Sequence, residues 1–348
     1  MKPVSLLFLF LLFVSTLSFA EERRILIAVS DNASPAVKNA AQSLAEAPLF
    51  AHWAKVGGAS SATPEFLSSE SLLPDSAFKT AAYNHLIVVG LKDEDPLLEK
   101  CWGNQIGLRK GEIDTLGYGH WKGDFGTVEC DRNPFLYSHK VKDNPYTTNI
   151  VKISGTSVVG LIEAVKAFQA GLLNGIVPVG KIELVEKSIL DRQPDYVAPP
   201  QMPERLGEMV CCGWTQIREE EYRAYYDFAN CRPTRIWRIK YLAPKCFDNV
   251  SGRAWVEGLH RLAYGNTVSI VQFETKEDAV KTFEAVAKAR NAKEETIGET
   301  KCVRFDQPVD TAFEESYGEI RYFVKEAKLF AVSLPERELA ELLKTLHQ

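Results

Sequence analysis

Residues 24–30 of the chain read RILIAVS, and residues 31–35 read DNASP. The first stretch is a continuous apolar run, which is typical of a strand buried on both faces of a parallel sheet. The second is a turn that ends in Ser34 and Pro35, an N-cap residue followed by proline at the first helical position. Apolar residues then recur at helical spacing up to Pro48. This order predicts a strand followed by a helix.

The same order recurs further along the chain. Residues 85–90 read HLIVVG, and Asp95 and Pro96 follow as the expected start of a helix. Residues 148–155 read TNIVKISG, and an amphipathic helix, capped by Thr156 or Ser157, is expected to run to a stop at Asn174-Gly175. Alternating strands and helices predict an α/β N-terminal domain with a mostly parallel sheet.

The second half has a different pattern. Residues 235–242 (RIWRIKYL) and 267–274 (TVSIVQFE) alternate like half-buried strands, and Thr275 is expected to cap a helix. Further strands are expected at 300–305, 320–324 and 328–334, the last two forming a hairpin, before a closing helix at 336–346. Strands grouped into hairpins predict a smaller antiparallel α+β domain.

Between the two patterns lies a proline-rich stretch with no periodicity, which is typical of an extended linker. The chain has 348 residues, more than a single core usually organises. We therefore expect a signal peptide at 1–20, an α/β domain at 21–190, a Pro-rich linker at 191–205 and an α+β domain at 206–348.

The first twenty residues have the pattern of a secretory signal peptide. One cation, Lys2, precedes the apolar run 4–13, and the small residues Ser18 and Ala20 come before an acidic start at Glu21. The apolar run is too short to span a bilayer, and no second run of its kind follows. We expect cleavage near Ala20, a secreted or periplasmic protein, and no transmembrane segment in the mature chain.

The composition is typical of a globular protein, with 45% hydrophobic and 25% charged residues. The formal net charge is −5, and this balance predicts no nucleic-acid partner, because proteins that bind nucleic acid usually carry a basic face. The six histidines form no His-x-x-x-His pair, and no Cys-x-x-Cys occurs. Neither a metal nor a cofactor is expected.

All seven cysteines follow residue 20, and seven is an odd number that leaves at least one thiol unpaired within a chain. The bridges we favour are Cys101–Cys130 and Cys231–Cys246, because each closes a modest loop and could add about 3 kcal/mol in an oxidising compartment. The alternative is that these residues stay reduced as small buried side chains.

Residues 117–126 read GYGHWKGDFG, and four glycines in ten residues would let the backbone bend around a ligand. Aromatic walls with a few polar groups are typical of small-molecule and sugar sites. The candidate ligand-binding residues are Tyr118, His120, Trp121 and Asp124. The alternative is an irregular excursion whose glycines make turns and whose aromatic side chains pack on the sheet.

Three acids near this segment, Asp124, Glu129 and Asp131, are the weak candidates for catalysis, with His120 beside them. Two carboxyl groups about 5 to 10 Å apart could cleave a glycosidic bond. The alternative is that these acids are solvated surface groups.

A cationic strand in the second half offers another interpretation. Arg235 and Trp237 share one face of residues 235–242, while Arg238 and Lys240 share the other. Arg235 beside Trp237 could hold an anionic glycan or an acidic partner by stacking and ion pairing. The alternative is an edge strand that its cations keep soluble.

Taken together, these features predict a secreted, non-catalytic protein that binds a glycan, a cell-envelope component or a protein partner. A secreted carbohydrate-acting hydrolase that uses paired carboxylates is the main alternative. A purely structural role in an envelope assembly is the third.

Overall fold

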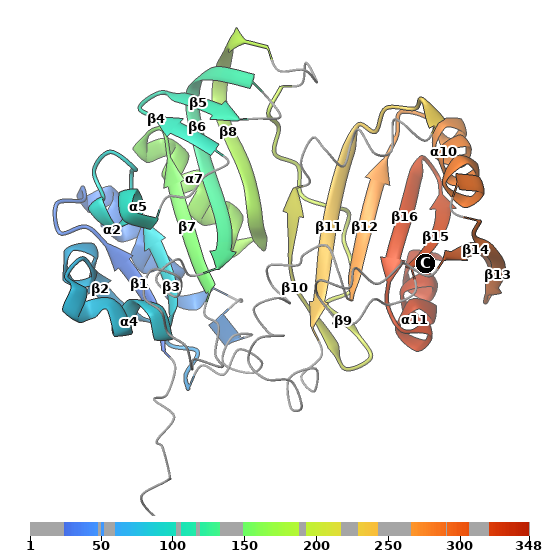
Figure 1. The fold of residues 1–348 in the computed structure, drawn as a ribbon, viewed down its shortest axis with the longest axis horizontal. Coiled ribbons are helices and arrows are strands. Elements are labelled where there is room, and N and C mark those ends of the chain that lie inside the picture. Colours follow the sequence, from blue (N-terminus) through green and yellow to red (C-terminus); the bar gives the residue numbers. More distant parts are fainter. Residues whose placement is uncertain are drawn as a thin grey trace, which may run out of the picture.

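The computed structural model describes residues 24–47, 50–51, 60–101, 106–115, 119–132, 149–187, 193–216, 229–242, 266–289, 291–305 and 320–347 (Figure 1). In these residues the strands form one mixed sheet, and helices pack on both of its faces. The sheet is parallel at its N-terminal end, and among the remaining described strands all pairs are antiparallel except one parallel pair at its centre.

The parallel end consists of β1 (Ile25–Val29), β2 (Glu65–Ser68), β3 (His85–Val89) and β7 (Asn149–Gly155). Their order across the sheet is β2-β1-β3-β7, and each neighbouring pair is parallel. The strands predicted at 24–30, 85–90 and 148–155 are confirmed. Their apolar side chains are almost completely buried, which is why these strands read as continuous apolar runs.

The helices of this part are α2 (Pro35–Gln42), α4 (Phe78–Tyr83), α5 (Pro96–Cys101) and α7 (Val158–Gln169). Two predicted caps are confirmed, because Ser34 Oγ accepts the Val37 N–H and Ser157 Oγ accepts the Gly160 N–H. α7 ends at Gln169 rather than at the predicted Asn174. Gly171 has φ +98°, a left-handed conformation that ends the helix and starts the next strand.

The middle of the sheet is formed by two long antiparallel strands, β6 (Gly119–Arg132) and β8 (Leu172–Glu186). A short hairpin of β4 (Ile106–Arg109) and β5 (Glu112–Thr115) pairs with the start of β6. The segment predicted as a ligand-binding loop, 117–126, is therefore strand from Gly119 onward.

Two glycines of β6 are required by its backbone geometry, one at a β-bulge and one at a close contact with α7. Gly123 has φ +139° at a register shift in the β6–β8 pairing. At Gly126 the backbone of β6 touches the backbone of α7 at Gly160, which leaves no room for a Cβ atom on either residue.

The parallel end and the antiparallel end belong to one continuous sheet, whereas the sequence predicted two separate sheets. The junction is the parallel pairing of β8 with β10 (Met209–Gln216), through Leu172 with Trp214 and Asn174 with Thr215. A two-residue strand, β9 (Arg205–Leu206), pairs with the other side of β10. The sequence could not show this junction, because the pairing partner of β8 cannot be seen in the local pattern of the chain.

The C-terminal end is antiparallel throughout its described strands, in the order β10-β11-β12-β16-β15-β14-β13. These are β11 (Arg235–Leu242), β12 (Thr267–Gln272), β13 (Lys293–Ile297), β14 (Thr300–Phe305), β15 (Ile320–Lys325) and β16 (Lys328–Ser333). The predicted β15–β16 hairpin is confirmed, and its turn contains Glu326 at φ +53°. The helices are α10 (Lys276–Ala289) and α11 (Glu336–His347), close to their predicted limits.

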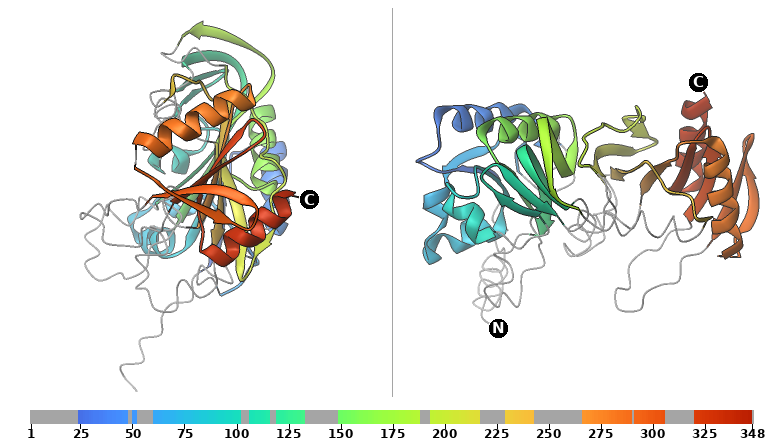
Figure 2. Two further views of the ribbon diagram at one scale, coloured as in Figure 1. Left: turned by 90° about the vertical axis from the view of Figure 1, so that its right-hand side faces the viewer. Right: turned by 90° about the horizontal axis from the view of Figure 1, so that it is seen from above.

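The two faces of the sheet are covered differently (Figure 2). One face carries the largest apolar cluster, which continues under α2, α7 and α11. On the other face α4 and α5 bury a cluster at the parallel end, and α10 buries a cluster at the antiparallel end. The described helices of this second face thus lie at its two ends.

Candidate functional site

The aromatic residue predicted to bind a ligand is part of a small core. Trp121 is 7% exposed and packs with Leu108, Ile113, Phe125 and Ile176. His120 is half-buried, and its Nε2 lies 3.1 Å from Glu112 Oε2 on β5. Tyr118 lies outside the described residues. In the structure, Trp121 therefore does not present a ring face to solvent.

The predicted acids are held apart by β6. Asp124 is half-buried, whereas Glu129 is buried in an ion pair with Lys152 of β7, with Oε2 and Nζ 2.8 Å apart. At roughly 3.3 Å per strand residue, Asp124 and Glu129 are about 16 Å apart along β6, beyond the separation used in glycoside hydrolysis. The side chain of Asp131 lies outside the described set.

Of the two predicted disulfides, only Cys101–Cys130 lies within the described residues, and it is not formed there. Cys101 and Cys130 are free and buried, and they belong to clusters on opposite faces of the sheet, so the sheet itself separates their thiols. Cys231 is also free, and Cys246 lies outside the described residues.

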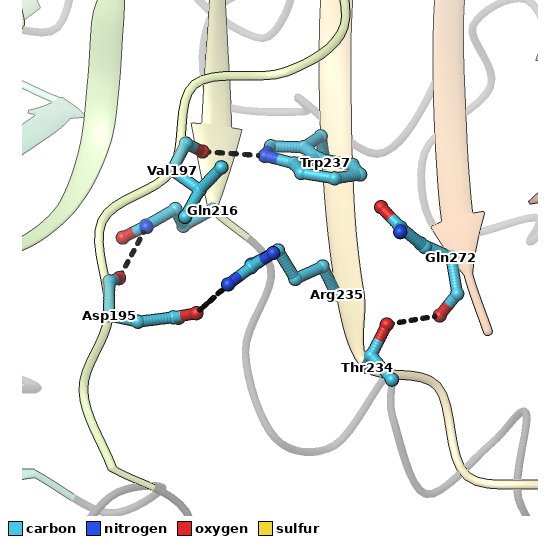
Figure 3. A network of polar contacts seen from close by, with 7 residues as sticks. All are labelled: Asp195, Val197, Gln216, Thr234, Arg235, Trp237 and Gln272. Carbon is cyan, nitrogen blue, oxygen red and sulfur yellow. Dashed lines mark hydrogen bonds and ion pairs between the residues drawn. The ribbon is translucent and has the colours of Figure 1, made fainter. Parts of the chain in front are cut away.

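The cationic strand predicted as a possible edge is β11, which lies inside the sheet between β10 and β12. One of its faces holds the proline-rich segment (Figure 3). Arg235 donates two hydrogen bonds to the Asp195 carboxylate at 2.8 and 3.0 Å, and Trp237 Nε1 donates to Val197 O at 2.8 Å. Residues 193–204 form neither helix nor strand, as a linker would, but these contacts fix part of them to the sheet. Arg235 and Trp237 are thus occupied within the chain.

The opposite face of β11 carries Arg238 and Lys240, and polar residues continue on both sides of them. Strand pairing places them in a lateral row from β7 to β12, because residues paired across strands point to the same face. We call this set the polar strip: Lys152, Glu129, Asn174, Thr215, Arg238 and Ser269, with Lys240 and Thr267 in the adjacent row.

The polar strip lies between two apolar clusters of the same face. By strand pairing, Lys152 is next to Val88 of the cluster under α4 and α5, and Ser269 is next to Ala331 of the cluster under α10. A polar row in this position is unusual, because the core of a sheet is normally apolar. Most of its members are buried, while Asn174 and Arg238 are half-buried and reach solvent.

Two side chains of the polar strip have buried polar atoms with no hydrogen-bond partner, Lys240 Nζ and Thr215 Oγ1. Lys240 is 2% exposed. Burial lowers the pKa of its ammonium group to about 8, and the nearby Cys212 and Cys130 thiols only partly oppose this effect. Ser154 Oγ, on β7 two residues after Lys152, is a third such atom on the same face.

Buried polar groups are nearly always paired, so these three atoms need an explanation. Elsewhere in the strip, Lys152 Nζ is paired with Glu129 Oε2, and Arg238 Nε donates to Ser269 Oγ at 3.3 Å. The orphaned atoms were missed by the sequence analysis, which noted the cations of β11 but not Thr215. The available signal was the pair of cations Arg238 and Lys240, which lie two residues apart and therefore on one face of β11.

A second polar cluster lies at the carboxyl ends of β1, β2 and β3, where open α/β sheets usually bind ligands. There the Asp95 carboxylate accepts hydrogen bonds from Ser30 N, Ser69 Oγ, and the Leu97 and Leu98 N–H groups of α5. Burial raises the pKa of Asp95, against the opposing effect of these bonds. This cluster is internally satisfied.

A cleft of about 600 Å³ lies between α7, β8 and residues 193–196, and Tyr196 forms part of its wall. Its charged groups are paired within the chain, Glu163 with Lys166 and Asp195 with Arg235. The polar strip is therefore the stronger candidate site, because its buried atoms lack partners.

Among the described residues, no group of three His, Cys, Asp or Glu side chains is placed to hold a metal ion. In the same part of the chain, no helix has the length and apolarity needed to cross a bilayer. Comparison with protein-family models, with curated proteins and with solved structures found no match for this chain.

Proposed function

We propose that this is a non-catalytic binding protein that holds a polar ligand, a glycan or another cell-envelope component, on the polar strip. The observation that carries the proposal is the pair of buried, unpartnered atoms Lys240 Nζ and Thr215 Oγ1 on neighbouring strands. Lys240 is paired with Gly213, two residues before Thr215, and such diagonal neighbours have Cβ atoms about 7 Å apart. One ligand can contact both.

The remainder of the strip supports this proposal. Half-buried Asn174 lies beside Thr215, and half-buried Arg238 lies on its other side. An amide and a guanidinium at the solvent-facing side, with an ammonium and a hydroxyl below, form a donor-rich surface for the oxygen atoms of a ligand. No reacting group is required for this role.

Export is part of the proposal. The pattern of residues 1–20 supports secretion or a periplasmic location, with the mature chain starting at Glu21. Mass spectrometry of the protein recovered from the expressing cells should give an N-terminus at Glu21. An intact Met1 on the exported protein would contradict cleavage.

Isothermal titration with a panel of neutral and acidic oligosaccharides and cell-wall fragments tests the binding function. Thr215→Val removes the unpartnered hydroxyl without changing the size of the side chain, and should weaken the tightest ligand about tenfold. The matched control is Thr345→Val on α11, where the exposed hydroxyl donates to Glu341 O at 3.1 Å and no effect on binding is expected. Equal affinities of the two variants, or no binding to any member of the panel, would contradict the proposal.

The hydrolase alternative has no support from the geometry of its predicted residues. Glu129 is committed to Lys152, and Asp124 lies about 16 Å away along the strand. Asp124→Asn should therefore leave ligand affinity unchanged, and no turnover of the bound glycan is expected.

A further inference from the structure

We infer that the polar strip recognises an anionic group, a carboxylate or a phosphate, which binds the buried ammonium group of Lys240. This inference rests on the proposed function and specifies the chemistry of its ligand. It follows from the charges of the strip and from the position of Lys240 among them.

The two buried lysines of the strip differ in one respect. Lys152 has its counter-charge, Glu129, directly opposite on β6 at 2.8 Å. Within the described part of the chain Lys240 has no such partner, and its Nζ makes no hydrogen bond. A buried cation without a counter-charge is strongly unfavourable, and an anion supplied by a ligand would remove that penalty.

The titratable groups near Lys240 are compatible with the binding of an anion. The titratable and charged groups that influence it are Cys212 on β10, Cys130 on β6 and Arg238 on its own strand. Burial raises the pKa of Cys212 to about 12, so this thiol stays neutral at pH 7. Thr215 Oγ1 can donate to the same anion from the neighbouring strand. The proposed site therefore offers one cation and one hydroxyl group to one anionic group of the ligand.

The protonation of Lys240 makes binding dependent on pH. With a pKa of about 8, the ammonium form predominates at pH 7 and is lost as the pH rises. At pH 9.5 about 3% of the free protein would carry the charge, so affinity for an anion should fall about thirtyfold. A neutral ligand would show no such decrease.

The experiment uses the full mature chain and three probes: inorganic phosphate, trigalacturonate and the neutral trisaccharide galactotriose. Affinity is measured by calorimetry at pH 7 and pH 9.5 for the wild type, Lys240→Met and Lys166→Met. Lys166 is the matched control, because it is exposed on α7 and paired with Glu163 at 2.6 Å. We expect an anionic probe to bind the wild type and Lys166→Met at pH 7, and to bind Lys240→Met at least tenfold more weakly.

The outcomes separate the two proposals. Phosphate binding without trigalacturonate binding would identify a phosphate ligand, and the reverse would identify a carboxylate. Galactotriose bound as tightly as trigalacturonate, or unchanged anion binding by Lys240→Met or by the wild type at pH 9.5, would overturn the inference while leaving a binding protein. Binding of none of the three probes would overturn the inference, whereas the proposed function fails only if the wider panel of glycans and cell-wall fragments is also not bound.

Discussion

At the parallel end of the sheet, the buried carboxylate of Asp95 accepts four hydrogen bonds, whereas in the centre the buried ammonium group of Lys240 makes none. Both side chains are almost completely removed from water. Asp95 connects the ends of β1 and β2 to the start of α5, so its burial is explained by the fold. The burial of Lys240 is not explained by any contact inside the described chain.

This difference indicates where to look for function. The strand order β2-β1-β3 places the carboxyl end of β1 at a change of direction, the usual ligand position in open α/β sheets. Here that position is occupied by the protein's own Asp95 and Glu70. A ligand is instead expected at the centre of the sheet, where polar atoms are buried without partners.

The largest effect is expected from Asp95→Ala, which tests whether the Asp95 cluster stabilises the fold. Asp95→Ala removes two capping bonds of α5 and leaves the Ser30 N–H and the Ser69 hydroxyl without a partner. We expect a loss of about 4 kcal/mol in the free energy of unfolding, measured by urea denaturation. Exposed Asp93→Ala is the control and should change the stability by less than about 0.5 kcal/mol. A small effect of Asp95→Ala would mean that this cluster does not stabilise the fold.

Much of this scaffold could be predicted from sequence, and the reasons are local. Continuous apolar runs identified β1, β3 and β7, and alternation identified β11 and β12 with nearly correct limits. Helix caps were also readable, because capping depends on neighbours in the chain. Ser34, Asp95 and Thr275 were predicted, and of the two candidates Thr156 and Ser157 the structure shows Ser157.

What could not be predicted depends on contacts between distant segments. Gly123 and Gly126 looked like loop glycines, yet one serves a bulge in β6 and the other the close approach of α7. An edge strand and a central strand share the same alternation, so the position of β11 was not readable. The same holds for the site: Lys240 was placed on the correct face of its strand, but its lack of a partner depends on strands distant in the sequence.

The next largest effect is the pH dependence of stability, which tests whether the charge of Lys240 is buried without compensation. In the folded protein the pKa of Lys240 is about 8, against 10.5 in an unfolded chain, so between these values the unfolded state binds more protons. The stability of the wild type should therefore rise with pH over this window, by about 3 kcal/mol at 1.4 kcal/mol per unit. Lys240→Met should be more stable than the wild type by about that amount at pH 7, and the difference should shrink toward pH 10.5. Equal stabilities at pH 7 would show that the charge of Lys240 is compensated.

The smallest effect concerns Glu70, the half-buried counterpart of Asp95 at the parallel end. Burial alone would raise its pKa, but hydrogen bonds from Ser30 Oγ, the Asp31 N–H and Ser68 Oγ outweigh this and lower the pKa to about 2. The folded pKa lies below the unfolded value of 4.5, so the stabilisation is present above about pH 4.5 and is lost as the pH falls toward 2. Because solvent screens this site, the contribution should stay below about 1 kcal/mol. Glu70→Gln should flatten the acid side of the stability profile without affecting its alkaline rise. A change in the alkaline rise would instead show that Glu70 and Lys240 are energetically coupled. The acidic cluster at the parallel end and the buried ammonium group at the centre would then not be independent.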